Sequence, residues 1–379
     1  MGSLIDREAA FEVLNGLPAI GPISLNRLLV AFDGDPLAIL GANPLELRQV
    51  KGLTKKAIDV LERWESHFDL EKTLDRRMSM GARFVSRESE LYPQMLKEIS
   101  DPPIGFYYLG NYDFKKPSVA MVGSRKTSQY GRAVAESFAR DLATLGFCVT
   151  SGMARGIDSC AHKGALSANG GSTVAVLGCG LNIVYPPENL DLYRSIQTHG
   201  AVVSEFPFGR NADRQTFPMR NRVVSGMSEA VVVIESEASG GSMITARFAG
   251  EQGRLLCAVP GRIDQKTSQG CNQLIRDGAI LLNSVDDLLE ELRYERSMPR
   301  VDGKSGDGGL LLELEGLSEV EAALMRQLEG GESFGVDALS DVLVLSSSEV
   351  AATLMMLELE GHVIKRLDGK YEAAVRIGR

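Results

Sequence analysis

The stretch Val119-Ala120-Met121-Val122-Gly123-Ser124-Arg125-Lys126 decides the fold of the centre of this chain. A short apolar strand stops at its glycine, and a helix is predicted to begin at about Ser128. In an open α/β sheet, such a junction presents free backbone N–H groups that bind anions. Because an arginine and a lysine occupy the same turn, the junction is predicted to bind phosphate.

Short apolar strands then alternate with helix-length segments as far as about Leu292, which is typical of a parallel sheet. The predicted strands are Val119–Val122, Cys148–Thr150, Thr173–Leu177, Ala201–Ser204, Ala230–Ile234, Leu255–Val259 and Ile280–Leu282. A further strand follows two prolines within Asp101–Gly110 and is expected to extend the same sheet. The predicted fold class is α/β, with a Rossmann-like core over residues 80–295.

The second strand of this series ends in the turn Ser151-Gly152-Met153-Ala154-Arg155-Gly156. Chains that bind NAD usually place an acidic residue here to hold the ribose hydroxyls. A small polar turn and Arg155 replace it, so the crevice suits phosphate and poorly suits a dinucleotide. No cofactor is predicted.

Two further clusters carry residues suited to nucleic acid. The segment Phe217-Pro218-Met219-Arg220-Asn221-Arg222 offers a stacking surface, two cations and an amide that can contact a base edge. Alternatively, one of its arginines pairs with Glu205 or Glu235, each near the end of a neighbouring strand. The second cluster is a glycine-rich turn that opens a helix and forms another anion-binding start, with Ser239, Gly240, Ser242 and Thr245 as candidate contacts.

The composition is that of a soluble globular protein, and 379 residues predict two or three domains. No apolar run is long enough for a membrane span, and the first residues do not resemble a signal peptide. The five cysteines are scattered and lack C-x-x-C spacing. They predict reduced thiols in a cytoplasmic protein, with no zinc site and no disulfides.

The net charge of −9 is unevenly distributed. Residues 311–379 hold 13 acidic and 6 basic residues, a net charge of −7, which leaves −2 for the first 310 residues. Because binding depends on local charge, the overall acidity does not exclude an anionic ligand.

Residues 1–75 are predicted to form a helical domain with a weak internal repeat of two glycine turns. Each turn leads into a helix, at Ser24–Phe32 and at Thr54–Trp64. The repeat resembles the helix-hairpin-helix family and its sterile-alpha-motif-like relatives, in whose DNA-binding members the turn approaches phosphate. The alternative is that both are helical-hairpin turns that need glycine for steric reasons. Lys51, Lys55 and Lys56 keep the second turn a candidate for phosphate binding.

Residues 296–309 have the composition of a flexible linker. After it, helices are predicted at Ser318–Leu328, Val336–Leu343 and Glu349–Glu360, the last capped by Ser347 or Ser348. A hairpin follows, so residues 310–379 are predicted to form a winged-helix-like domain. Its third helix has three glutamates and no cation, which favours protein contact over DNA contact. Three cations on the hairpin keep DNA binding open, namely Lys365, Arg366 and Lys370.

A catalytic interpretation has weak support. Asp158 and His162 share a helix face, and Glu205 ends a strand, but no known catalytic motif is present. No catalytic residue and no metal site are predicted.

With these motifs in place, the chain resembles the DprA/Smf family, the DNA-processing proteins of bacterial natural transformation. The resemblance covers residues 120–280 and rests on segments in a fixed order: Val122-Gly123-Ser124-Arg125, Ser151–Asp158, Leu177–Gly180, Tyr185-Pro186, Ser204-Glu205, Phe217–Arg222, Ser239–Thr245, Val259-Pro260-Gly261 and Gly270-Cys271-Asn272.

The resemblance implies a homodimer that binds single-stranded DNA in a basic pocket and loads the RecA recombinase. By the same resemblance, Arg125 would contact phosphate beside Gly123, and Arg220, Asn221 and Arg222 would line the pocket with Phe217. Ser124, Lys126 and Arg155 complete the predicted DNA contacts.

The alternative class is a nucleotide-binding protein or a nucleoside-monophosphate phosphoribohydrolase of related fold, with the loop motif P-G-G-x-G-T-x-x-E. Here Ser239 replaces the proline, Ile244 the threonine and Arg247 the catalytic glutamate. A cation in place of that carboxylate argues against this chemistry.

Overall fold

The computed structural model describes residues 5–292, 317–328, 333–360, 362–365 and 369–373. The chain divides into two compact units, Met1–Glu295 and Arg296–Arg379. The predicted linker at 296–309 lies outside the described residues.

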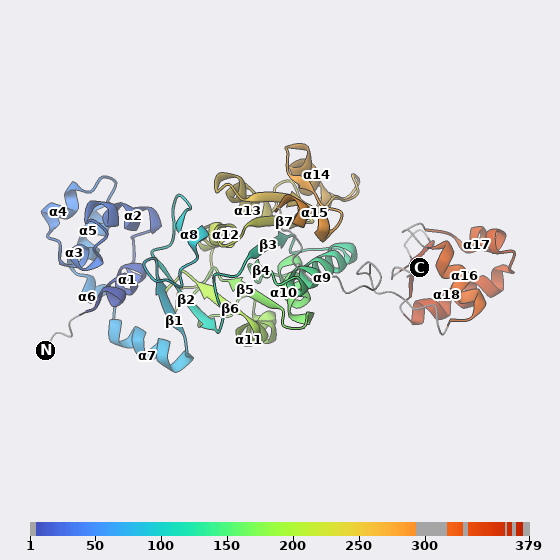
Figure 1. Cartoon of the computed structure of the whole chain (residues 1–379), viewed down its shortest axis with the longest axis horizontal. Helices are drawn as coiled ribbons and strands as arrows, with labels where there is room; N and C mark the ends of the chain where they lie inside the picture. The colour runs from blue at the N-terminus through green and yellow to red at the C-terminus, as the bar shows by residue number, and fades with distance from the viewer. Residues whose placement is uncertain (1–4, 293–316, 329–332, 361, 366–368, 374–379) are drawn as a thin grey trace. The chain divides into compact units, whose positions relative to one another are not determined.

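In the described residues, the larger unit begins with helices α1 to α7 (Figure 1), several of which start at a side-chain cap. Asp6, Thr54 and Asp69 each accept a hydrogen bond from the amide three residues further on. The helices are α1 (Arg7–Gly16), α2 (Pro22–Ala31), α3 (Pro36–Gly41), α4 (Pro44–Gln49), α5 (Lys55–Glu62), α6 (Trp64–His67) and α7 (Leu70–Met80). The helix predicted at Thr54–Trp64 ends at Glu62, because Arg63 departs from helical geometry and separates α5 from α6.

Among the described residues, nine strands of this unit form one sheet with the order β1-β2-β6-β5-β4-β3-β7-β8-β9. They are β1 (Arg83–Ser86), β2 (Gly105–Gly110), β3 (Ser118–Gly123), β4 (Cys148–Ser151), β5 (Ser172–Val176), β6 (Ala201–Ser204), β7 (Ala230–Ile234), β8 (Leu255–Ala258) and β9 (Ile280–Leu281). The seven strands β3 to β9 are mutually parallel. Next to β6, β2 pairs in the antiparallel direction, and β1 pairs antiparallel with β2. The predicted α/β class, the seven predicted parallel strands and the extension by β2 are confirmed.

The sheet is buried on both faces. Along β3, Val119 and Met121 belong to one hydrophobic cluster, and Ala120 and Val122 belong to another on the opposite face. This double burial explains why the strands are apolar throughout rather than alternating. The helices of this part of the unit are α8 (Gln94–Lys97), α9 (Gln129–Thr144), α10 (Ile157–Ser167), α11 (Leu190–His199), α12 (Thr216–Gly226), α13 (Gly241–Glu251), α14 (Gln269–Arg276) and α15 (Val285–Glu291).

The order of the strands creates a switch point beside β3. The chain proceeds from β3 through β4 and β5 to β6 on one side, then returns to place β7 on the other side of β3. The loops after β3 and β7 therefore diverge. Ligands of open α/β sheets bind in the crevice that opens at such a point.

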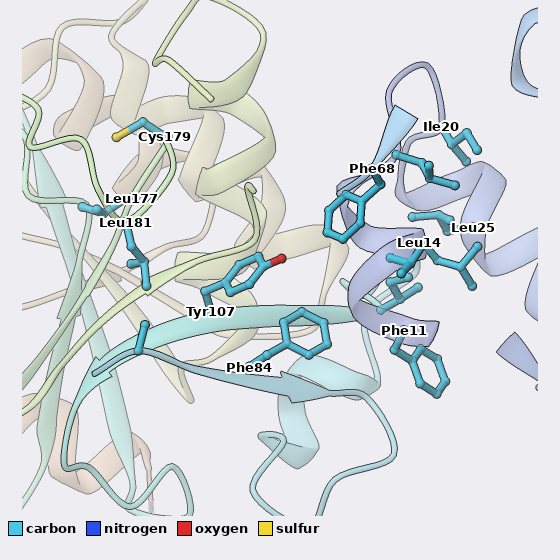
Figure 2. Packing of buried hydrophobic residues seen from close by; sticks show 14 of the residues in the cluster. Phe11, Leu14, Ile20, Leu25, Phe68, Phe84, Tyr107, Leu177, Cys179 and Leu181 are labelled. Atoms are coloured by element: carbon cyan, nitrogen blue, oxygen red, sulfur yellow. The ribbon is translucent and has the colours of Figure 1, made fainter. Parts of the chain in front are cut away.

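The N-terminal helices share a core with the sheet. One hydrophobic cluster contains Phe11 and Leu14 of α1, Phe84 of β1, Tyr107 of β2 and Leu181 after β5. Figure 2 shows Tyr107 between the helical side chains and those that follow β5. This continuous packing holds the N-terminal helices against β1 and β2 of the sheet.

The smaller unit contains α16 (Glu319–Gln327), α17 (Val336–Leu343) and α18 (Ser347–Leu359), followed by the antiparallel pair β10 (Val363–Lys365) and β11 (Tyr371–Ala373). These elements enclose a hydrophobic cluster of their own. Ser346, not Ser347 or Ser348, caps α18, because its hydroxyl accepts the Glu349 amide. The winged-helix assignment stays a prediction, and Arg366 lies outside the described residues.

Within the described part of the chain, no single helix is both long and apolar enough to cross a membrane. Only α17 and α18 taken together, bent by 114°, meet the length and composition required.

Candidate nucleic-acid interface

A groove of about 470 Å³ opens at the switch point between β3 and β7. Its walls come from the loops after β3, β4 and β7 and from the first turns of α12 and α13. Of the predicted site residues, the groove is lined by Gly123, Ser124, Arg125, Lys126, Phe217, Arg220, Asn221, Gly240, Ser242 and Thr245.

The loop after β3 presents Arg125 to the groove. Its exposed guanidinium lies over the ring of Phe217, 5.1 Å from the ring centroid, in a cation–π contact. The ring of Tyr185, which is 38% exposed, is 5.6 Å from Phe217 on centroids. The cation and the two aromatic rings together form a surface suited to phosphate and base.

Glycine is required where the loops after β3 and β4 meet. Gly156 has φ +76°, and a Cβ there would lie 2.2 Å from the carbonyl oxygen of Ser124. A Cβ at Gly123 would lie 1.9 Å from the carbonyl oxygen of Ile234 on β7. Both glycines therefore allow backbone segments to approach more closely than any side chain permits.

Glu235, at the end of β7, holds the loop after β3 in place. Its carboxylate accepts hydrogen bonds from the Thr127 hydroxyl at 2.6 Å, the Ser128 amide at 2.8 Å and the Ser128 hydroxyl. Its carbonyl accepts the Ser124 amide at 2.7 Å. Glu235 itself has φ +50°, an uncommon conformation for a non-glycine residue. From the sequence, Glu235 was expected only as a partner for an arginine, and no ion pair between Glu235 and an arginine is present among the described residues.

Arg220 forms the floor of the groove. It is 5% exposed, and its Nη1 donates to the carbonyls of Gly152 and Val176. Burial lowers its pKa, an effect that the nearby Asp158 carboxylate opposes. A Cβ at Gly152 would lie 2.2–2.7 Å from three guanidinium atoms, so the glycine makes room for this arginine.

Asp158 supports the same floor from the start of α10. Its Oδ2 accepts the amides of Gly152 at 3.1 Å and Ala154 at 3.3 Å. Burial raises its pKa, which the charge of Arg220 and the two amides oppose. His162 instead bonds the Thr173 hydroxyl through Nδ1 at 2.7 Å, so no hydrogen bond joins the two residues weighed as an acid–base pair.

The structure places Arg222 away from the groove. Its side chain is 2% exposed and donates twice to the Glu205 carboxylate, at 2.6 and 2.7 Å, with Asp101 at 3.2 Å. The expectation that Arg222 lines the pocket is therefore wrong, and the alternative pairing with Glu205 is confirmed. Arg220 and Arg222 lie about 200° apart around α12, so they face opposite directions.

Of the predicted contacts near the start of α13, some line the groove and one does not. Ser242 and Thr245 are buried, and the Ser242 hydroxyl donates to the Ser236 hydroxyl at 2.8 Å. Asn221 lies close by, with its amide nitrogen 3.4 Å from the carbonyl oxygen of Gly241. Ser239 is exposed and is not among the residues that line the groove, contrary to expectation.

Arg155 lies beside the groove rather than in it. With Tyr185 and Cys179 it lines an adjoining pocket that shares Arg125, Phe217 and Arg220 with the groove. Its exposed side chain pairs with Glu188. Burial raises the pKa of Cys179 to about 11, so this thiol stays protonated at neutral pH.

Arg214, an exposed residue that lines the groove, was not predicted from the sequence. It precedes the Phe217 cluster in a polar turn, and only the path of that turn brings it to the groove. Within the described ranges, no group of three His, Cys, Asp or Glu side chains is placed to hold a metal ion. All five cysteines are buried and unpaired.

Comparison with known protein families identifies the family of this chain. The model of the family described as DNA recombination-mediator protein A matches residues 83–293, which is more than half of the chain. The chain belongs to this family. The match covers the whole sheet and every loop of the groove.

Among members of the recombination-mediator family, the chain is 35% identical to protein Smf of Synechocystis over 278 residues, which are 72% of this chain and 69% of the relative. It is 41% identical to DNA processing protein DprA of Streptococcus pneumoniae over 206 residues, which are 54% and 72% of the two chains. It is 42% identical to protein Smf of Escherichia coli, covering 56% of that relative.

Two solved structures of the family are similar in fold. DNA processing protein A from Streptococcus pneumoniae superposes with a TM-score of 0.65 at 34% identity, over 76% of this chain and 97% of the other. DNA processing protein A from Helicobacter pylori, solved to show its single-stranded DNA binding mode, has a TM-score of 0.51 at 28% identity, over 56% and 96%.

Proposed function

We propose that the groove at the switch point binds single-stranded DNA. The observation that carries this proposal is the exposed Arg125 stacked on Phe217 above the buried cation of Arg220. A positively charged groove and an aromatic face on which bases stack are the elements that sequence-tolerant strand binding requires. Membership in the recombination-mediator family and the DNA-binding relative from Helicobacter pylori support the same ligand.

The charge of the groove favours a phosphate backbone. Arg125, Lys126 and Arg214 are exposed, and none of them has an ion-pair partner within the described residues. The two carboxylates that line the groove are Asp158 and Glu237, and the first is already bonded to two amides. Among the described residues, the groove is therefore lined by three exposed cations without ion-pair partners and by two acids, of which only Glu237 is exposed.

The bound strand is then passed to a recombinase. We place the protein in the cytoplasm as a homodimer that loads RecA onto single-stranded DNA and carries out no catalysis. Its family membership supports a mediator role. Sedimentation of the protein with RecA and a DNA strand tests the RecA contact, and light scattering tests the dimer.

The groove is tested by fluorescence anisotropy with an oligo-dT strand of about 15 nucleotides across a salt series. Arg125→Ala is expected to weaken binding about tenfold and to reduce the slope of log K against log salt by about 0.7, because one phosphate contact is lost. Arg247→Ala is the matched control, since Arg247 is exposed on α13 but pairs with Glu251 at 3.4 Å and does not line the groove.

Equal effects of the two substitutions, or binding that is insensitive to salt, would contradict the proposed site. Release of free base from a nucleoside monophosphate would instead support the phosphoribohydrolase alternative. The position of its catalytic glutamate is occupied here by Arg247, whose side chain contacts Glu251 and Phe248 rather than the groove.

A further inference from the structure

A second basic patch lies on the helical domain, outside the groove. Between Leu47 and Ile58 the sequence holds four cations and no acid, namely Arg48, Lys51, Lys55 and Lys56. All four are exposed. Within the described residues, none of them forms a hydrogen bond or ion pair through its side chain. Asp59, one turn further along α5, is the first acid that follows them.

A fifth cation reaches the same turn from another helix. Arg27 of α2 lies against Gly52, where a Cβ would be 1.9 Å from its Nη1. Gly52 has φ +84°, a backbone conformation that favours glycine, and the absence of a Cβ there leaves room for the guanidinium of Arg27. Arg27 is exposed and has no carboxylate partner in the described ranges. We name the surface formed by Arg27, Arg48, Lys51, Lys55 and Lys56 the α5 patch.

The first glycine turn of the repeat lacks these properties. Pro22 follows Gly21 at the first position of α2 and has no N–H to donate. Arg27 is the only cation between Leu17 and Leu28, and it points to the second turn. The two turns of the repeat therefore differ in charge, and the cations of both gather at one of them.

The position of the α5 patch relative to the groove is set by direct contacts. Asn26, next to Arg27, donates to the carbonyl of Pro102 at 3.0 Å and accepts from Arg87 at 2.6 Å. Asn15 donates to the carbonyl of Glu205 at 2.8 Å. These bonds and the shared core in Figure 2 hold the helical domain on the sheet.

We propose that the α5 patch binds the phosphate backbone of the DNA strand where that strand extends beyond the groove. The groove has a volume of only about 470 Å³, so a longer strand must extend across the protein surface outside it. Five unpaired cations around one turn repel each other until an anion neutralises them. A polyanion can neutralise all five cations at once. The described patch has no buried site that would hold a single phosphate. The inference rests on the proposed function of the groove.

The experiment compares two oligo-dT strands on the full-length chain, one of about 10 nucleotides and one several times longer. The variant is Lys55→Ala with Lys56→Ala. Its matched control is Lys115→Ala with Lys116→Ala, which removes the same charge from another exposed lysine pair. Circular dichroism confirms that both variants are folded.

The patch variant is expected to bind the short strand like wild type and the long strand about tenfold more weakly, with a salt slope reduced by about 1.4 for two lost phosphate contacts. The control is expected to leave both unchanged. Equal binding of the long strand by the two variants would overturn the inference. If a DNA duplex of the same length is titrated alongside, a loss confined to the duplex would also overturn it, in favour of a duplex site.

The Arg125→Ala variant separates this inference from the proposed function. If the groove is the primary site, Arg125→Ala weakens binding of both strands. If Arg125→Ala has no effect while the patch variant weakens long-strand binding, the groove proposal fails and the patch binds DNA alone. If only Arg125→Ala acts, the groove stands and the patch inference fails.

Discussion

The substitution Gly152→Ala tests whether the buried arginine organises the groove. The added Cβ would lie 2.2 Å from Nη1, 2.4 Å from Cζ and 2.7 Å from Nη2 of Arg220. A side-chain end can usually move away from such a contact at low cost. Here the guanidinium is 5% exposed and bonded to two carbonyls, so movement breaks both hydrogen bonds.

The magnitude follows from those two bonds. A hydrogen bond to a charged group contributes about 1.5–3 kcal/mol, so Gly152→Ala is expected to lower the free energy of unfolding by about 3 kcal/mol. Displacing Arg220 also removes a cation from the groove floor, and DNA affinity is expected to fall at least tenfold, or about 1.4 kcal/mol. Urea denaturation measures the first quantity and anisotropy with oligo-dT the second.

Gly241→Ala is the matched control, because Gly241 also lines the groove but has nothing within 4 Å of an added Cβ. It is expected to be neutral or slightly stabilising, since alanine favours the first turn of α13. In an Arg220→Ala background, Gly152→Ala should cost little. If it costs the same in both backgrounds, the contact with Arg220 does not explain the need for glycine.

Three further changes test other parts of the site. Glu235→Gln should weaken oligo-dT binding several-fold and lower stability by about 1–2 kcal/mol, because the loop after β3 loses charge-assisted bonds; unchanged binding would contradict its positioning role. His162 has a pKa lowered to about 3 by burial and by Arg220, so its neutral form contributes stability that is complete above pH 6.5 and is lost as the pH falls toward 3. His162→Gln should therefore lose less stability than wild type between pH 7 and pH 4 in urea titrations, and parallel curves would refute this. Arg222→Leu leaves Glu205 buried without its partner and should cost about 3–5 kcal/mol of stability, with DNA affinity of the folded fraction unchanged; a selective loss of affinity would return Arg222 to the groove.

Local sequence was sufficient to predict the seven parallel strands of the central sheet and β2, whereas β1 was not predicted. The boundaries of Ala201–Ser204 and Ala230–Ile234 agree with β6 and β7 to the residue, because strands buried on both faces are continuous apolar runs. The helix start at Ser128 was equally local, since its hydroxyl accepts the Gly131 amide. The cap of α18 was misplaced by one or two residues because three consecutive serines offer the same chemistry.

The groove was only partly predictable. Arg220 and Arg222 are two residues apart on one helix, and their sequence neighbourhood does not show which of them faces the crevice. The outcome depends on Glu205, whose strand lies on the other side of β3 from β7 and whose carboxylate binds Arg222. Ser239 and Gly240 are adjacent, yet only the glycine lines the groove. Arg214 was missed because a turn, not a helix or strand, brings it there.

The sequence by itself determined where the parallel strands form, where each of them stops and which of these ends carry cations and glycine, because those properties depend on residues close together in the chain. Only the tertiary structure decided that β7 lies against β3. That pairing joins segments more than a hundred residues apart, and it brings Glu235 to the Ser124 loop and Phe217 under Arg125. The backbone pairing across β3 therefore turns separate phosphate-binding turns into one groove.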